Sequence, residues 1–196
     1  NACLLQMFFI HSFSIMESAV LLAMSMDRFV AIYSPLRYTT ILTSPRIFGT
    51  GAVIALKSIM LMAPLPMLLR RLPFCGHNAL SHSYCLHPNL IQLPCGDISI
   101  NNVYGLFIVI STFGLDSLLI IVSYGLILHT VLNIATGEER RKALNTCGSH
   151  VCAVLAYYVP MISLSMVHRF GRHVSPLLHT MMANAYLFFP PIVNPV

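Results

Sequence analysis

The feature that most constrains the fold is a series of long apolar segments in which charged residues are almost absent. Residues 47–69 carry a single charge, Lys57, and residues 98–136 carry only Asp116. Residues 143–167 and 174–196 carry no charge. A helix needs about 20 consecutive apolar residues to cross a hydrocarbon layer of about 30 Å. The sequence therefore predicts an all-α membrane protein.

The composition supports the same class, because 57% of the 196 residues are hydrophobic and only 9% are charged. A soluble domain carries far more charge. We expect one domain over residues 1–196, with a long polar loop at about 70–100 and a charged turn at 137–142. The second helix is expected to end at Pro64 and Pro66. The five predicted transmembrane helices cover about residues 1–34, 46–69, 101–135, 142–168 and 175–196.

The net charge of +5 lies in the loops and therefore indicates membrane topology, not a nucleic-acid partner. Basic residues are slightly more numerous on one side, which the positive-inside rule favours as cytoplasmic. That side holds Arg28, Arg37, Arg46, Arg140, Arg141 and Lys142, and the other holds Arg70, Arg71, Arg169 and Arg172.

The cysteines give a clearer indication of topology. Cys75, Cys85 and Cys95 lie in the long loop, and Cys3 lies at the same membrane face. Their grouping on one side predicts two disulfides in an oxidising exterior, whereas Cys147 and Cys152 face the interior and stay reduced. A zinc or copper site is the alternative for this loop. Its ligands would be Cys75, His77, His82, Cys85 and His87.

An acid and an arginine, Asp27-Arg28, stand together at the end of the first apolar segment. They precede a basic, proline-broken loop at residues 35–38 (Pro-Leu-Arg-Tyr). Such a pair can hold a helix end in one state and release it in another when a partner binds. The alternative is an interfacial pair that only reaches toward water.

Together with further motifs, this stretch resembles the olfactory receptors among the rhodopsin-like G-protein-coupled receptors. The most specific motif is the run at residues 142–150 (Lys-Ala-Leu-Asn-Thr-Cys-Gly-Ser-His). Finer details resemble the class I, fish-like branch, whose members often respond to carboxylic acids. The other motifs are Ser83-Tyr84-Cys85, Ser123-Tyr124, Pro190-Pro191-Ile192-Val193-Asn194-Pro195, His11, Leu115-Asp116-Ser117 and the run at 165–170 (Ser-Met-Val-His-Arg-Phe).

The resemblance implies that the chain is part of a longer protein and corresponds to helices three to seven of a seven-helix bundle. It implies a multi-pass plasma-membrane receptor, not an enzyme. A small volatile or short-chain acidic odorant would bind near the outer face, and a heterotrimeric G protein of the olfactory, stimulatory type would bind inside. No cofactor is expected beyond a sodium ion at Glu17.

The resemblance also assigns individual residues. The ligand-binding set is Phe8, His11, His87, Ser165 and Arg169. The activation residues are Asp27, Arg28, Tyr124 and Tyr158, and the disulfides are Cys3–Cys85 and Cys75–Cys95.

Simpler interpretations of these residues remain open. Arg169 lies four residues after Ser165 and so shares its helix face, but it can equally be an exposed loop cation. A lone histidine on an apolar face, such as His11, is usually a hydrogen-bonded core residue. Tyr158 precedes Pro160, which can simply bend the helix. Glu17 is costly at membrane depth unless it is paired or hydrated.

Two other functions compete with the receptor hypothesis. An ion-coupled transporter could use Glu17, Asp116 and Lys57 as a charged relay, but the internal repeats typical of transporters are absent from the sequence. A partial gene product without function is the other alternative.

Overall fold

A computed structural model describes residues 2–73, 85–91, 93–134 and 137–170, together with residues 181 and 184. The chain divides into two compact units, Asn1–Ile134 and Ala135–Val196, which are described separately below. Three helices among the described residues are long and apolar enough to cross a membrane. The predicted all-α membrane class is therefore confirmed, while the segment predicted at 175–196 lies outside the described residues apart from 181 and 184.

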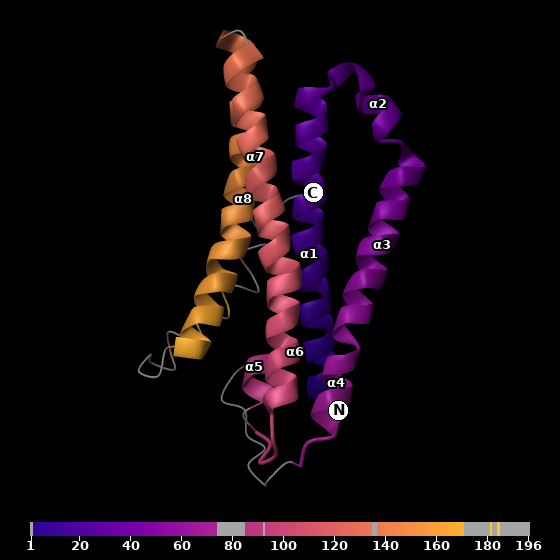
Figure 1. Ribbon diagram of the computed structural model, residues 1–196, viewed down its shortest axis with the longest axis vertical. Helices are drawn as coiled ribbons and strands as arrows, with labels where there is room; N and C mark the ends of the chain where they lie inside the picture. The colour runs from indigo at the N-terminus through magenta and orange to yellow at the C-terminus, as the bar shows by residue number, and fades with distance from the viewer. Residues whose placement is uncertain are drawn as a thin grey trace. The chain divides into compact units, whose positions relative to one another are not determined.

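Helix α1 (Ala2–Tyr33) is the central helix of the first unit. It packs against α7 on one side and α3 on the other (Figure 1). In its most apolar window 39% of the residues are buried, compared with 22% in each of the other two membrane-capable helices. Its length of 32 residues exceeds the bilayer requirement, so its two ends reach the interfaces, where the polar contacts described below are made.

Two short helical turns follow α1, the 3-10 turn η1 (Pro35–Arg37) and helix α2 (Tyr38–Ile41). Pro35 begins η1, where its missing N–H leaves no hydrogen bond unmade. Arg46 closes the other end by donating from Nη1 to the carbonyl oxygens of Thr40 at 3.3 Å and Ile41 at 2.9 Å. The basic loop predicted after Pro35 is therefore an ordered, largely helical connection.

The second membrane-capable helix is formed by α3 (Ser44–Met62) and α4 (Pro64–Arg70), separated by a turn at Ala63. Pro64 and Pro66 were expected to end this segment, yet helix continues through both to Arg70. The physical reason is their position, because proline is tolerated in the first turn of a helix, where the amide has no partner to lose.

The long polar connection contains one short helix, α5 (His87–Leu90), before the third membrane-capable helix begins. That helix comprises α6 (Ser99–Val109), a π-helical turn η2 (Ile110–Gly114) and α7 (Leu115–Ile134). At the start of α6, Asp97 Oδ1 accepts hydrogen bonds from the backbone N–H and hydroxyl of Ser99. These bonds hold the pKa of the exposed Asp97 carboxyl below its usual value.

A hydrophobic cluster fills the outer half of this unit, where α1, α4, α6 and the segment around α5 meet. In a membrane these elements are held together by van der Waals packing of such side chains and by interhelical hydrogen bonds, because lipid tails are as apolar as the side chains themselves. Its buried members are Met7, Ile15, Met62, Leu65, Leu69, Cys85, Leu90 and Ile108.

The second unit contains α8 (Gly137–Phe170), which carries Pro160 in its interior. The charged turn expected at residues 137–142 is the first part of this helix. Glu138 and Lys142 form an exposed i,i+4 ion pair with an N–O distance of 3.6 Å. This acid-before-base order favours helix, so the helix begins earlier than the apolar pattern alone indicates.

Candidate functional site

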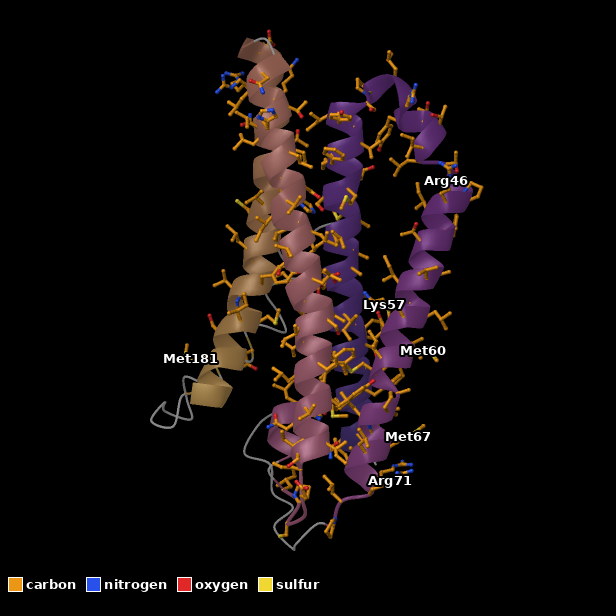
Figure 2. The ribbon with its side chains drawn as sticks, viewed as in Figure 1. Arg46, Lys57, Met60, Met67, Arg71 and Met181 are labelled. Carbon is orange, nitrogen blue, oxygen red and sulfur yellow. A yellow bond between two sulfur atoms is a disulfide. The ribbon has the colours of Figure 1, made fainter. Side chains whose placement is uncertain are left out.

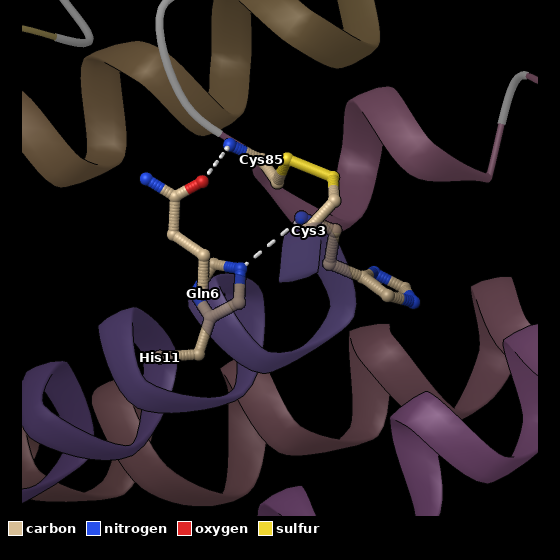
Figure 3. The surroundings of a disulfide bond; sticks show 5 residues. Cys3, Gln6, His11 and Cys85 are labelled. Atoms are coloured by element: carbon tan, nitrogen blue, oxygen red, sulfur yellow. Dashed lines mark hydrogen bonds between the residues drawn. A yellow bond between two sulfur atoms is a disulfide. The ribbon is translucent and has the colours of Figure 1, made fainter. Parts of the chain in front are cut away.

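The outer end of α1 carries a strap formed by Cys85, Leu86 and His87. A disulfide joins Cys3 to Cys85, with Cα atoms 5.4 Å apart (Figure 3). Gln6 Oε1 accepts a hydrogen bond from the Cys85 N–H at 3.3 Å, and His11 Nε2 accepts one from the His87 N–H at 3.2 Å. Three residues of the first turns of α1, Cys3, Gln6 and His11, therefore hold the strap.

The geometry at His11 fixes its tautomer. Because Nε2 accepts the backbone N–H of His87, a neutral ring carries its proton on Nδ1. Protonation of Nε2 would remove the acceptor and break this contact. His11 is therefore hydrogen-bonded, as the simpler interpretation expected, and its partner is the backbone N–H of His87 in the strap.

The side chain of His87 is buried beside Gly105 of α6. A Cβ atom added at Gly105 would lie 2.9 Å from His87 Cε1, so the histidine ring occupies space that a larger residue would fill. Phe8 lies three residues before His11 on α1 and packs against the hydrophobic cluster. Its ring meets that of Phe9 edge to face, with centroids 5.5 Å apart. The structure therefore brings His11 and His87 into contact and places Phe8 on the same part of α1.

Three predicted residues of the outer site are not placed by these contacts. Ser165 and Arg169 belong to α8, and their side chains lie outside the described part of the structure. Cys95 is disulfide-bonded, but its predicted partner Cys75 lies outside the described residues.

At membrane depth, α1 and α7 are joined by a buried polar contact. The Ser18 hydroxyl donates to Asp116 Oδ2 at 2.9 Å, and both residues are buried. An unpaired carboxyl group would be costly at this depth, so Ser18 explains how Asp116 is accommodated. Glu17, one residue earlier on α1, is partly buried. No cluster of three or more metal-ligating side chains occurs among the described residues.

At the inner end of α1, Asp27 is held by Tyr38, the last residue of the Pro-Leu-Arg-Tyr run. The Tyr38 hydroxyl donates to Asp27 Oδ1 at 2.8 Å. This hydrogen bond and the negative charge of Asp27 raise the pKa of the Tyr38 phenol, while the nearby Arg28 charge opposes the shift. Asp27 and Arg28 form no ion pair with each other. Adjacent helical residues project in different directions, which accounts for this.

The other two activation residues lie on different units. Tyr124 is on α7, next to Ser123, whose hydroxyl lies 3.6 Å from Met26 Sδ of α1. Tyr158 is buried on α8 and packs edge to face against Tyr157, with ring centroids 5.1 Å apart. Pro160 follows two residues later within the same helix.

Two of the contacts that were not predicted have a signal in the sequence, and a third has none. Gln6 is a polar residue one turn after Cys3 in an otherwise apolar run. Tyr38 ends the Pro-Leu-Arg-Tyr run, where a proline turn can bring it back to the helix end. Gly105 is recognisable only in three dimensions, because nothing in its neighbours points to His87.

Comparison with known families matches residues 1–196 to the family described as Olfactory receptor. The chain is 58% identical over its full length to Olfactory receptor 51I1 of Homo sapiens, covering 62% of that protein. It is also 58% identical to Olfactory receptor 51I2 and 54% identical to Olfactory receptor 51G2, both of Homo sapiens, covering 63% and 62% of those proteins. The chain therefore spans about three fifths of the length of these relatives.

Proposed function

The chain belongs to the olfactory receptor family, a family of multi-pass plasma-membrane receptors and not of enzymes, and on that premise we propose that it forms the ligand-binding and signalling part of an odorant receptor. A small volatile or short-chain acidic molecule binds on the outer side of the bundle. Binding activates a heterotrimeric G protein of the stimulatory, olfactory type on the inner side.

The observation that carries this proposal is the strap on α1. A disulfide and two hydrogen bonds position Cys85–His87 against the outer end of a helix whose inner end holds Asp27 and Arg28. A covalently fixed strap keeps polar groups in place beside the apolar side chains of α1, which favours selective binding of a small ligand. The same rigid helix then connects the ligand-binding end to the G-protein end.

We propose that Arg169 binds the acidic group of the ligand, that Ser165, His11 and His87 provide further polar contacts to it, and that Phe8 contacts its apolar part. An arginine can hold a carboxylate through two parallel hydrogen bonds in a partly dehydrated cavity. The two histidines already meet through the strap, so a ligand that contacts either one also affects the position of the other.

For activation, we propose that the ligand binds the active arrangement more tightly and shifts the population toward it. Pro160 leaves a carbonyl without its helical partner and makes α8 a bending point near Tyr158. Because Tyr38 holds Asp27, the Arg28 guanidinium is available to the G protein without first breaking an ion pair with its neighbour. Tyr124 is assigned to the same inner cavity, and Glu17 to a modulatory sodium ion.

A chimera tests the proposal, with this chain replacing the matching region of human Olfactory receptor 51I1. Short-chain carboxylic acids are expected to raise cyclic AMP in cells that express the chimera, and Arg169→Ala should shift the response to higher concentration by about tenfold or more. Arg172→Ala is the matched control because it removes the same charge three residues away. An unchanged acid response in Arg169→Ala would reject the ligand assignment. Solute flux in vesicles without any cyclic AMP response would favour the transporter instead.

A further inference from the structure

We propose that the outward face of α3 and α4 holds one glycerophospholipid, with its phosphodiester bound to Arg71 and an acyl chain lying along Met60 and Met67. The site is a groove of about 290 Å³. It is lined by Met60, Ala63, Pro64, Met67, Leu68 and Arg71.

The groove exists because the helix changes at Ala63. The turn there separates α3 from α4, and the proline ring of Pro64 replaces a backbone donor at the start of α4. Ala63 adds only a methyl group at the break, while Met60 and Met67 stand on either side of it. Methionine is flexible and adapts to irregular apolar partners, so these walls suit a hydrocarbon chain of variable conformation.

The groove faces away from the rest of its unit. The residues of this helix that pack inward are Met62, Leu65 and Leu69, each at most 4% exposed, whereas Met60 and Met67 are 66% and 65% exposed. The inward set and the groove set follow two opposite stripes at helical spacing. Figure 2 shows Met60, Met67 and Arg71 projecting from the side of α3 and α4 away from α1. No other element of the described part of the chain covers this face, and in a membrane-spanning helix such an exposed apolar face is the one that meets lipid.

Arg71 lies where a phosphate group would be. The span Ser44–Arg70 has 27 residues, which corresponds to roughly 40 Å of helix and exceeds a hydrocarbon core of about 30 Å. Its last turn therefore lies among the headgroups, on the same side as the Cys3–Cys85 disulfide. The Arg71 side chain is exposed, and within the described residues it has no hydrogen-bond or ion-pair partner. A planar guanidinium suits bidentate binding of a phosphodiester.

The test uses the whole chain in nanodiscs of phosphatidylcholine that contain a small fraction of phosphatidylcholine with a photoactivatable acyl chain. After illumination, labelled peptides are identified by mass spectrometry. We expect labelling to concentrate on residues 60–71. A diacylglycerol probe with the same chains and no phosphate should label this segment about tenfold less, as should phosphatidylcholine in the Arg71→Gln variant.

Two variants serve as controls. Lys57→Gln removes an exposed charge from the same span without touching the groove, and it should leave labelling unchanged. Arg71→Lys keeps a point charge but loses the planar fork, so it should retain part of the labelling. Helical content measured for each variant shows that it is folded.

The proposal is overturned by equal labelling with the diacylglycerol probe, or by equal loss of labelling in Lys57→Gln and Arg71→Gln. It is also overturned if labelling by phosphatidylcholine concentrates on another segment of the chain in place of residues 60–71. None of these readouts depends on odorant binding, so the outcome is independent of the receptor function proposed above.

Discussion

The buried hydrogen bond between α1 and α7 offers the sharpest test of how this membrane bundle is held together. Ser18→Ala removes the hydroxyl that donates to Asp116 Oδ2 at 2.9 Å and leaves a buried carboxyl without that donor. Ser58→Ala is the matched control. Ser18 and Ser58 are both fully buried, but the Ser58 hydroxyl donates to the Ile54 carbonyl of its own helix at 2.8 Å.

The expected cost follows from what each change leaves unpaired. Hydrogen bonds between membrane helices contribute about 0.6–2 kcal/mol, and an unsatisfied buried acceptor costs about 1–3 kcal/mol. We therefore expect Ser18→Ala to lower the free energy of unfolding by about 2 kcal/mol, or the melting temperature by roughly 4–8 °C for a chain of this length. Ser58→Ala should cost well under 1 kcal/mol, because the Ile54 carbonyl keeps its helical hydrogen bond.

Thermal unfolding of the purified chain in detergent, followed by the loss of helical circular dichroism, measures both effects. The double variant Ser18→Ala/Asp116→Leu should recover much of the lost stability, because replacing both partners by apolar groups removes the unpaired acceptor. Equal losses in Ser18→Ala and Ser58→Ala would refute the reasoning. So would a double variant less stable than Ser18→Ala alone.

Three further predictions concern the strap and the inner loop. Cys85→Ser opens a disulfide that spans 82 residues, so it should lower the free energy of unfolding by about 4 kcal/mol by the chain-entropy estimate. Chemical denaturation under non-reducing conditions measures this, and the difference from the unchanged chain should vanish in reductant. Gly105→Ala places a Cβ 2.9 Å from His87 Cε1 and should destabilise the fold by about 1–3 kcal/mol. Gly125→Ala is the control: its Cβ would have nothing within 4 Å, so it should be neutral or stabilising by up to about 1 kcal/mol. Equal shifts of the melting temperature in the two variants would contradict the geometry. The Tyr38 phenol should titrate above its ordinary pKa, so its contribution to stability is complete below about pH 10 and is lost as pH rises through the pKa of the folded state. An ultraviolet difference titration against Tyr38→Phe measures this pKa. A normal pKa would show that the hydrogen bond to Asp27 is absent in solution.

The membrane class could be predicted from the sequence because hydrophobicity over a long window is a strong signal. A run such as residues 98–136, in which Asp116 is the only charge, has few alternatives once its length matches the bilayer. The ends of the helices were less accessible. The start of α8 at Gly137 depends on a local Glu138–Lys142 pair, and the continuation of α4 through Pro64 depends on where the proline falls within a turn.

The polar contacts could be predicted only in part. The strap pairing Cys3–Cys85 is the one that the family resemblance implied, whereas the hydrogen bonds of Gln6 and His11 to the strap backbone depend on how residues 85–87 follow α1. Asp116 stands out in the sequence as the only charge of residues 98–136, but its partner Ser18 lies 98 positions away. The π-helical turn η2 that precedes Asp116 has no simple sequence signature. At Asp27 the sequence points to the adjacent arginine, whereas in the structure the hydroxyl of Tyr38, returned by the following turn, donates to the carboxylate.

The central claim is that an outer ligand controls an inner G-protein site through this bundle. The most direct measurement is guanine-nucleotide exchange on a stimulatory Gα subunit by the purified chimera, with and without a panel of short-chain carboxylic acids and neutral odorants. The account predicts ligand-dependent exchange that is lost in Arg28→Ala and kept in the control Arg46→Lys. Absence of exchange with every compound, accompanied by solute transport in vesicles, would contradict it.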